Sequence, residues 1–381
     1  MKNLKEILVS PETPVREAIR RIGDSGRKVV VVVDDQQILR GIFTDGDMRR
    51  YIFKGGNLNS PISSAMNDKP YIQAVGYSHE DLQKCFVERN RFMCPVVDVE
   101  GRLQEVVFRN EYSDRLENFS LRRLPDGVVT VIMAGGLGKR LYPYTKVLPK
   151  ALIPVGSHPI LTHVMNSFKA YGCNEFHLVV NHKRNLIKAY YAEEDPGCKI
   201  VYHDEDKPLG PAGGLCFLKG VLKATFFLSN CDILVEADYA EVYAFHKSEK
   251  NLITAVGALR ELEVPYGVIE IGGNGSAIKA ISEKPSSSYL ANVGVYVVEP
   301  EVLDDVEDGK VLLITDLIAR YIAEGKKVGV YPVSGGAWQD MGQLWLRSKQ
   351  ATRPACPPAP SNSIRYSTGA GLRPGPLFFP G

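Results

Sequence analysis

The sequence predicts an α/β protein of at least two parts, the larger one built on a mixed, mainly parallel sheet. From residue 128 onward, short apolar runs alternate with segments of helical periodicity, which is typical of parallel strands covered by helices. The first of these runs, VVTVIM, ends in a glycine-rich loop, AGGLGKRLYPYTKVLPK, at 134–150. The N-terminal third contains one pattern of elements twice, which predicts a smaller α/β domain in front.

Composition limits the classes of partner. The 381 residues hold 46 Lys plus Arg against 44 Asp plus Glu, so charge gives no reason to expect nucleic acid or an anionic membrane as a partner. Apolar runs such as KVVVVVD are far shorter than the roughly 20 residues of a membrane helix, and MKNLKEILVSPE lacks a signal sequence. The seven cysteines form no CxxC pair, which favours reduced, mostly buried thiols. We therefore expect a cytoplasmic protein.

The repeated pattern in the N-terminal third reads helix, strand, turn, strand, helix. One copy begins at LVSPETPVREAIRR and the other at VGYSHEDLQKCFVERN. Their order and spacing resemble a pair of CBS modules, with the first at 1–57 and the second at 58–115. This resemblance implies a regulatory domain that binds an adenine nucleotide between the two copies.

The motif GIFTDGD in the first copy carries the two residues that the CBS resemblance assigns to the ligand, Thr44 and Asp47. The second copy reads EVVFRNE and lacks both groups, so one nucleotide site is expected rather than two. The alternative is that the two residues only cap a helix and that the pair stabilises a dimer. Residues 116–127, with Pro125 and Gly127, predict a linker to the larger domain.

Two widespread phosphate-binding motifs do not fit the loop at 134–150. A dinucleotide fold needs G-x-G-x-x-G and an acid about 20 residues later, but Leu141 replaces the third glycine and no acid follows there. A P-loop ends in Gly-Lys-Ser/Thr, whereas Gly138 and Lys139 are followed by Arg140. Glycine allows backbone amides to approach phosphates closely, but a glycine-rich turn alone is usually only a turn.

The stretch AGGLGKRLYPYTKVLPKALIPVG closely resembles the nucleotidyltransferase signature of nucleotide-sugar pyrophosphorylases, G-G-x-G-x-R-L-x-P-x-T-x-x-x-P-K. The resemblance continues through further motifs in the family's order over residues 128–345 and implies a Rossmann-like, GT-A-like sheet. It also implies catalytic roles for Arg140 and Lys150. The nucleotide would be bound by the loop residues Ala134, Gly135, Gly136 and Gly138.

Later motifs imply the rest of the site. EDKPLGPAGG resembles the base-binding segment, although Pro211 stands where many relatives have threonine, and it implies roles for Glu205, Leu209 and Gly210. SNCD and AWQDMG supply two carboxylates, Asp232 and Asp340, which the family pattern places on Mg²⁺. VPYGVIEI, SEKP and ANVGVYVVEP resemble sugar-binding strands, and they assign the sugar phosphate to Gly267, Glu283, Lys284 and Asn292.

The base can be argued from its hydrogen-bonding edge. Guanine offers two donors that a carboxylate accepts, whereas uracil and thymine need a donor and an acceptor together. Glu205 and Asp206 precede KPLG, which favours GTP and is similar to mannose-1-phosphate guanylyltransferases and to CBS-containing glucosamine-1-phosphate guanylyltransferases of bacterial surface-sugar pathways. The alternative is that both acids are solvated loop charges.

The chain departs from the family pattern after Gln343. Proline, glycine and serine dominate from 353, so residues 346–381 predict a disordered tail or reflect a change of reading frame.

Two functions remain. One is a homo-oligomeric, magnesium-dependent enzyme that uses an NTP and a sugar 1-phosphate and is regulated through the CBS pair. The other is a nucleotide-sensing or scaffold protein without turnover; the intact loop and both aspartates favour the enzyme.

Overall fold

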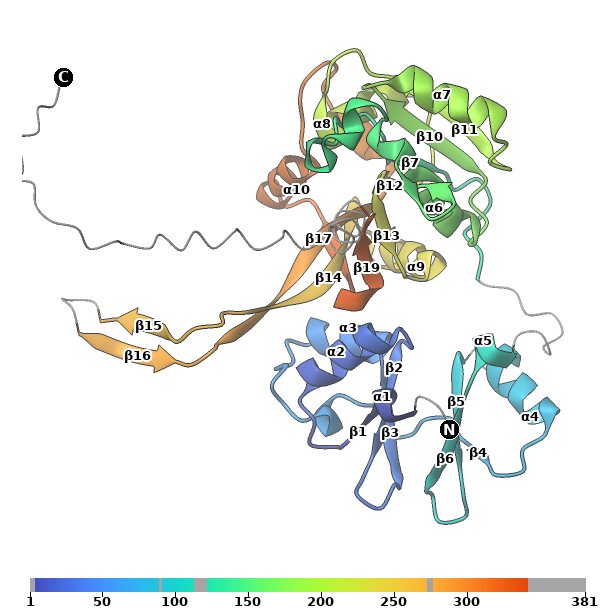
Figure 1. The fold of residues 1–381 in the computed structure, drawn as a ribbon, viewed down its shortest axis with the longest axis vertical. Coiled ribbons are helices and arrows are strands. Elements are labelled where there is room, and N and C mark those ends of the chain that lie inside the picture. The colour runs from blue at the N-terminus through green and yellow to red at the C-terminus, as the bar shows by residue number, and fades with distance from the viewer. Residues whose placement is uncertain (1–3, 89–90, 113–121, 273–276, 342–381) are drawn as a thin grey trace, which may run out of the picture.

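The computed structural model describes residues 4–88, 91–112, 122–272 and 277–341 (Figure 1). The predicted tail at 346–381 and the predicted linker up to residue 121 lie outside the described residues. The last part of that linker is packed rather than free, because Leu124 is buried in the core of the larger domain and its amide donates to the Tyr171 carbonyl at 2.8 Å.

The first N-terminal unit is a three-stranded sheet with helices on it. Strand β2 pairs in parallel with β1 and antiparallel with β3, and a register shift lies between Val32 and Val33. All five residues of β2 are buried, as its unbroken run of valines predicts. The elements are α1 Leu4–Ile7, β1 Leu8–Val9, α2 Val15–Ser25, β2 Val29–Val33, β3 Leu39–Thr44 and α3 Asp45–Phe53.

The second unit repeats this sheet. Strand β5 pairs in parallel with β4 and antiparallel with β6, and the register shift recurs between Val96 and Val97. The element order predicted for the second copy is therefore present. The elements are η1 Ile62–Ser64, β4 Gln73–Ala74, α4 His79–Gln83, the π-helical turn η2 Lys84–Glu88, β5 Met93–Val97, β6 Leu103–Phe108 and α5 Arg109–Tyr112.

The larger domain is built on a seven-stranded sheet of order β11-β10-β7-β12-β17-β14-β18. Neighbouring strands run parallel except where β17 pairs antiparallel with both β12 and β14. The predicted mixed, mainly parallel sheet is confirmed. Its strands are β7 Thr130–Met133, β10 Glu175–Val180, β11 Lys199–Asp204, β12 Phe226–Asn230, β14 Ile253–Glu263, β17 Ser286–Val298 and β18 Val328–Val333.

Helices cover both faces of this sheet. Helices α6 Ile160–Lys169, α7 Arg184–Glu193 and α9 Tyr239–Glu249 share one hydrophobic core with it, and α8 Gly210–Gly213 and α10 Ile314–Ala323 share the other. The alternation of strands and helices predicts a helix over LCFLKGVLK, at 215–223, but the structure has only the short 3-10 turn η7 Gly214–Leu218. The turn ends at Leu218, because the next residue, Lys219, has a ψ of 130° and is no longer helical.

Two small ribbons extend the sheet. Strands β13 Ile233–Val235 and β19 Trp338–Asp340 pair antiparallel beside the carboxyl end of β12. Strands β15 Val268–Ile271 and β16 Ile278–Ser282 form a hairpin at the far end of the long β14–β17 pair, and Figure 1 shows it projecting from the body. Every residue of β15 and β16 is exposed, including four isoleucines, Ile269, Ile271, Ile278 and Ile281.

The first N-terminal unit packs directly on the larger domain. Phe53 of α3 stacks on Phe245 of α9 with ring centroids 5.8 Å apart, and the Arg49 guanidinium lies over the Tyr331 ring at 4.5 Å. The closest approach is between backbones, because a Cβ on Gly336 would lie 2.3 Å from the Gly23 carbonyl oxygen. Gly336 belongs to the short turn η9 Gly335–Ala337, which leads into β19.

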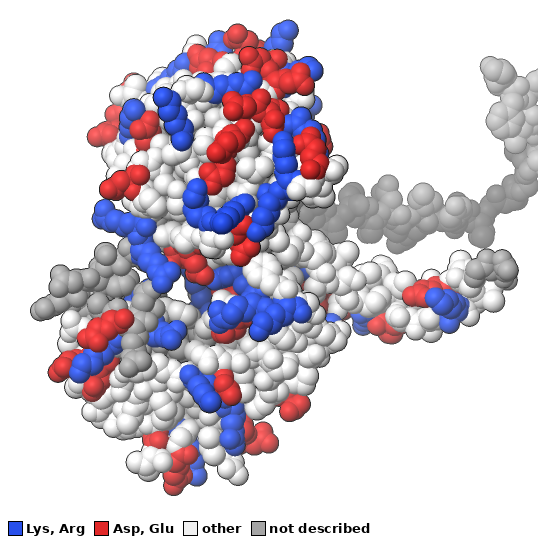
Figure 2. Space-filling view, turned by 180° about the vertical axis from the view of Figure 1, so that it is seen from behind, with Lys and Arg blue, Asp and Glu red and all other residues white. Residues whose placement is uncertain are grey.

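The outer surface carries charges of both signs. On the face in Figure 2, Lys and Arg side chains are intermixed with Asp and Glu, and several basic side chains gather where the upper and lower parts meet. Among the described residues, no helix is long and apolar enough to cross a membrane. Four of the six described cysteines are buried, and all six are free thiols.

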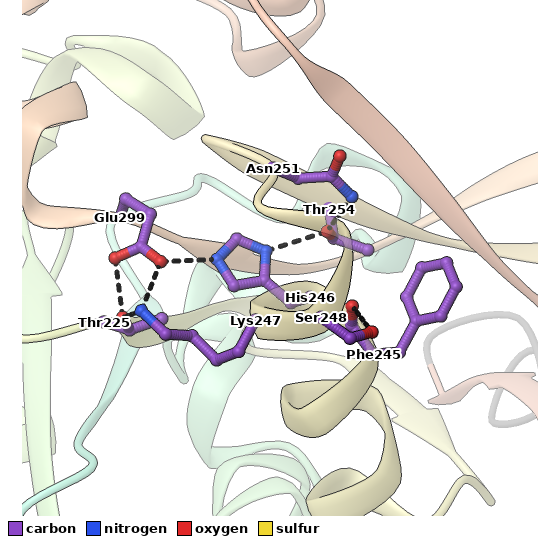
Figure 3. Close-up of polar contacts among 8 residues, drawn as sticks. All are labelled: Thr225, Phe245, His246, Lys247, Ser248, Asn251, Thr254 and Glu299. Carbon is purple, nitrogen blue, oxygen red and sulfur yellow. Dashed lines mark hydrogen bonds and ion pairs between the residues drawn. The ribbon is translucent and has the colours of Figure 1, made fainter.

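A buried polar network joins α9 to the sheet far from the glycine-rich loop. The fully buried His246 lies with Nδ1 2.8 Å from Thr254 Oγ1 and Nε2 3.2 Å from Glu299 Oε1 (Figure 3). Glu299 also accepts hydrogen bonds from Lys247 Nζ at 2.7 Å and from Thr225 Oγ1 at 2.6 Å. The Thr–His–Glu order resembles a hydrolase triad, but the burial of His246 and Thr254 gives it a structural role.

We predict that His246→Ala lowers stability by about 2–4 kcal/mol, since it opens a cavity and removes one hydrogen-bond partner from each of Thr254 and Glu299. Thermal melting of the full chain measures the loss, and the exposed His158→Ala is the control. Burial lowers the pKa of His246, so folding favours the neutral ring. Wild-type stability should therefore fall as the pH drops below about 6.5. An equal loss in His158→Ala would contradict the assignment.

Candidate functional site

The glycine-rich loop leaves the sheet at the carboxyl end of β7. The Ala134 amide donates to the Val179 carbonyl at 2.8 Å, which holds the start of the loop against β10. Three 3-10 turns then follow, η4 Lys139–Leu141, η5 Tyr144–Lys146 and η6 Lys150–Leu152. The loop is thus a series of tight turns at the sheet edge where parallel α/β folds bind ligands.

The loop glycines differ in what surrounds them. A Cβ on Gly135 would lie 2.9 Å from Glu205 Oε2, and one on Gly138 would lie 2.7 Å from Thr145 Cγ2. Gly138 also has a φ of 63°, which disfavours other residues. No atom lies within 4 Å of a Cβ placed on Gly136, so this part of the loop faces open space.

Each predicted carboxylate is paired with a cation of the loop. Lys150 Nζ lies 2.5 Å from Asp232 Oδ2, and Arg140 Nη1 lies 3.4 Å from Asp340 Oδ2. The carboxylates are adjacent because β13 pairs with β19: Ile233 lies opposite Asp340, and the Met341 amide donates to the Asp232 carbonyl at 3.0 Å. The structure therefore brings all four predicted catalytic residues together.

The two pairs differ in burial. The side chains of Lys150 and Asp232 are 17% and 4% exposed, whereas Arg140 is 68% exposed. Burial alone would lower the pKa of Lys150, but the Asp232 carboxylate beside it outweighs this effect and raises the pKa. Burial likewise raises the pKa of Cys231 to about 11, so this thiol stays protonated. Lys150 is thus a permanent cation at neutral pH.

The donor set at this centre fits a hard divalent cation. The buried Asp232 carboxylate contacts the Lys150 ammonium at 2.5 Å, and Asp340 stands on the neighbouring strand. Within the described ranges, no group of three or more His, Cys, Asp and Glu side chains forms a complete metal cage. Mg²⁺ commonly uses one or two carboxylates and takes its other ligands from water and substrate phosphates.

Glu205 lies beneath the loop rather than on its surface. The residue is 4% exposed, its Oε1 accepts the Leu209 amide at 2.9 Å, and its Oε2 faces Gly135. Burial raises the pKa of this carboxyl, and the Leu209 hydrogen bond offsets part of the effect. Asp206 differs, since its side chain is 90% exposed and lies 3.4 Å from Arg184. Of the two acids, Glu205 is the one beside the glycine-rich loop.

The segment after Glu205 is held against the chain before α10. Leu209 is buried, and its carbonyl accepts the Leu312 amide at 2.9 Å. Gly210 has a φ of 77°, and a Cβ there would lie 2.8 Å from the Leu312 carbonyl oxygen. A glycine is required at 210 for both reasons.

The predicted sugar-phosphate residues fall into two places. Asn292 lies on β17, where its side chain accepts the Gly294 amide at 3.1 Å and donates to the Tyr296 hydroxyl at 2.7 Å. Gly267 and Glu283 face each other at the base of the projecting hairpin, next to Lys284. In the described part of the chain, no hydrogen bond or ion pair joins this second group to the two aspartates.

The two predicted CBS ligand residues form a helix cap. Thr44 Oγ1 donates to Asp47 Oδ2 at 2.7 Å and accepts the Asp47 amide at 3.3 Å, and the Thr44 amide donates to the same carboxylate. Asp47 also pairs with Arg50 at 2.5 Å. This reciprocal capping box stabilises the start of α3. These are the contacts expected from the alternative in which the two residues only cap a helix.

Sequence reasoning missed two residues that support the site. Asn181 donates from Nδ2 to the Glu205 carbonyl at 2.7 Å and packs against Gly135. Lys183 donates to the carbonyl groups of Thr145 and Lys146 and thereby holds the loop. Both residues directly follow β10, at the ligand edge of the sheet. This position is the signal that could have indicated them from the sequence.

We predict that Lys150→Met destabilises the chain by about 3–5 kcal/mol, since it leaves the Asp232 carboxylate buried without its cation. Adding Asp232→Asn to this variant removes the buried charge and should recover much of the loss. Chemical unfolding of the full chain measures both effects, with the exposed Lys223→Met as the control. No recovery in the double variant would show that the ion pair does not control stability.

Sequence comparisons find relatives for both parts of the chain. The family model described as Nucleotidyl transferase matches residues 129–346, and the CBS domain model matches residues 3–54. Mannose-1-phosphate guanyltransferase of Schizosaccharomyces pombe is 31% identical over 254 residues, which cover 61% of this chain and 69% of that protein. The catalytic subunit beta of mannose-1-phosphate guanylyltransferase from Drosophila pseudoobscura is 31% identical over 225 residues, covering 57% and 60% of the two chains.

Among solved structures, HddC from Yersinia pseudotuberculosis shares 21% identity with a TM-score of 0.47, over 59% of this chain and 100% of that one. The chain spans between 60% and 69% of the two curated relatives named above. The family model alone matches more than half of the 381 residues and includes the loop and both aspartates. On this sequence evidence, the chain belongs to the nucleotidyl transferase family and carries a CBS domain in front of its transferase domain.

Proposed function

We propose that the chain transfers a nucleoside monophosphate, preferably GMP, from a nucleoside triphosphate to a sugar 1-phosphate, releasing pyrophosphate. The observation that carries this proposal is the pairing of two loop cations with two carboxylates: Lys150 with Asp232 and Arg140 with Asp340. Such an arrangement balances the charge of a polyphosphate at the carboxyl end of a parallel sheet. The names of the relatives support the same activity.

The chemistry requires positioning rather than a protein nucleophile. A phosphate oxygen of the sugar 1-phosphate attacks the α-phosphorus in line, its bond to phosphorus forms, and the bond to the leaving pyrophosphate breaks. The open backbone at Gly136 offers amide donors to the triphosphate. Lys150 stays charged in its buried position and counters the negative charge that develops at the α-phosphate.

Asp232 and Asp340 would hold Mg²⁺, which would neutralise and align the reacting phosphates. Asp232 contributes a buried carboxylate oxygen, which Lys150 contacts at 2.5 Å. Asp340 stands opposite Ile233 on the paired strand. The β13–β19 pairing therefore keeps the two carboxylates in register before any ligand binds.

Further assignments belong to the proposal. Asn292, Gly267, Glu283 and Lys284 would bind the sugar phosphate, and an adenine nucleotide would bind at the CBS unit that contains Thr44 and Asp47. The enzyme would act in the cytoplasm as a homo-oligomer. Its product would serve as a glycosyl donor in bacterial surface-glycan synthesis.

The second candidate function is a nucleotide-sensing or scaffold protein without turnover. A pyrophosphate-release assay of GTP, UTP, dTTP and ATP against a panel of sugar 1-phosphates separates the two. Release with GTP and one sugar phosphate is expected. Nucleotide binding without release from any pair would favour the sensing role.

We predict that Asp232→Asn and Asp340→Asn each lower turnover by about a hundredfold or more, because each keeps the side-chain shape but removes a metal-binding charge. Steady-state pyrophosphate release measures the effect, and melting temperature checks that the fold persists. Asp304→Asn changes an exposed acid and serves as the control. Near-normal turnover by Asp232→Asn would remove the metal assignment.

A further prediction concerns the base. In Glu205→Gln the amide oxygen can still accept the Leu209 amide, but the amide nitrogen would face a guanine donor. Such a mismatch costs about 1–3 kcal/mol, or roughly 5- to 150-fold in kcat/KM for GTP. UTP use should hold or rise. The exposed Asp206→Asn is the matched control, and an unchanged GTP to UTP ratio in Glu205→Gln would contradict the guanine assignment.

A further inference from the structure

Helix α2 of the first N-terminal unit contacts the turn that leads to Asp340. A Cβ on Gly23 of α2 would lie 2.9 Å from the Gly336 amide nitrogen, and a Cβ on Gly336 would lie 2.3 Å from the Gly23 carbonyl oxygen. Neither glycine has a φ in the left-handed region, so the backbone conformation does not require glycine at either position. The close approach of the two segments does require it, because any side chain would push them apart.

Gly23 stands inside a helix, where glycine is unfavourable. Helix α2 runs from Val15 to Ser25, and alanine is a much better helix former than glycine. The glycine therefore lowers the intrinsic stability of α2. What it allows in return is the contact between this helix and the turn η9 of the transferase domain.

The turn η9 is held from its other side by β14. A Cβ on Gly335 would lie 2.4 Å from the Leu259 carbonyl oxygen, and the Leu259 side chain packs against the core of the first N-terminal unit. The guanidinium of the next residue, Arg260, lies 4.8 Å from the centre of the Trp338 ring on β19. The turn thus lies between α2 and β14, and Asp340 follows it at the end of the short strand β19.

The same helix contacts the base of the projecting hairpin. Arg16 Nη1 donates to Ser286 Oγ at 2.7 Å and lies 3.6 Å from Glu261 Oε1. Ser286 begins β17 and directly follows the segment 283–285, which includes two of the predicted sugar-phosphate residues. Arg16 and Gly23 are separated by about two turns of an α-helix, so both lie on one face of α2.

We propose that Gly23 and Arg16 are positioning residues for the transferase reaction: through one face of α2, the first N-terminal unit fixes Asp340 relative to the segment that binds the sugar phosphate. This inference rests on the proposed function of both places. A misplacement of about 1 Å can lower a rate by about a hundredfold, so a contact remote from the reacting atoms controls turnover. The contact needs no ligand on the N-terminal units.

Gly23→Ala tests the contact with η9 by the sign of its effect. If the contact has no role, this variant keeps its turnover and melts at the same or a higher temperature, because alanine favours the helix. If the methyl group displaces η9, kcat for pyrophosphate release falls about tenfold or more, while KM for GTP at saturating Mg²⁺ changes little. We expect the second result. The matched control is Asp24→Ala, the next residue of α2, whose side chain is 71% exposed.

Trp338 on β19 gives a readout that does not depend on turnover. The chain has two tryptophans, and Trp345→Phe leaves Trp338 as the single one. In that background we expect Gly23→Ala to increase the quenching of Trp338 fluorescence by acrylamide, since the ring loses its contact with Arg260, and Asp24→Ala to leave the quenching unchanged. Unchanged quenching together with unchanged kcat in Gly23→Ala would overturn the proposal.

Arg16→Ala tests the contact with the hairpin. We expect KM for the sugar 1-phosphate to rise about threefold to tenfold with kcat near the wild-type value, and Arg16→Lys, which keeps the charge, to recover part of the loss. Arg20→Ala is the control, because Arg20 belongs to the same helix and forms its ion pairs with Glu17 and Asp24 of α2. An unchanged KM in Arg16→Ala would overturn the role of Arg16.

The outcomes separate this inference from the proposed function. If the wild-type chain releases no pyrophosphate from any pair of substrates but Gly23→Ala still increases the quenching of Trp338, the contact stands and the proposed function fails. If the wild type is active and Gly23→Ala changes neither kcat nor the quenching, the proposed function stands and this inference fails.

Discussion

The pairing of β13 with β19 is the constraint on which the site depends. Each strand is only three residues long, and they come from positions about a hundred residues apart in the sequence. Their hydrogen bonds put Asp232 and Asp340 on neighbouring strands, where the loop cations Lys150 and Arg140 reach them. Without this ribbon, two like charges would have no reason to lie together in a partly buried place.

The glycine-rich loop likewise depends on a few specific contacts. Its shape follows from contacts that exclude a Cβ, such as Gly135 against Glu205 and Gly138 against Thr145. Lys183 fixes the middle of the loop through backbone carbonyls, so its conformation is defined before a phosphate arrives. Preorganised amides lose little entropy on binding, which is what an enzyme that only positions its reactants requires.

The sequence predicted the parts of the fold that periodicity and glycine placement determine. The buried strands β2, β7 and β12 follow from apolar runs, and the ligand edge follows from where those runs end. The sequence indicated that Asp232 and Asp340 lie close together only through the order of the family motifs. No local pattern indicates it, because strands that pair across a long separation produce no periodicity in the sequence. Asn181 escaped notice because one polar residue after a strand is also an ordinary turn residue.

Long-range contacts account for what the sequence could not predict. The meeting of Gly23 and Gly336 depends on two separate backbones, and neither glycine is distinctive in its own segment. The His246 network likewise combines β12, α9, β14 and the end of β17 through side chains scattered over about 75 residues. Near Leu215, apolar residues predicted a helix, but the glycines there favour a short turn under the sheet.

The projecting hairpin has a consequence for the behaviour of the protein in solution. Its outer edges have unpaired backbone groups, and Ile269 lies opposite Ile281 in a stripe of branched apolar side chains. A ribbon of this composition is prone to pair with strands of other molecules through its edges. The ion pair between Lys279 and Glu270 adds two charges to it. These two charges interrupt the apolar stripe and oppose association between hairpins. Colloidal stability at high protein concentration therefore depends on this small part of the chain.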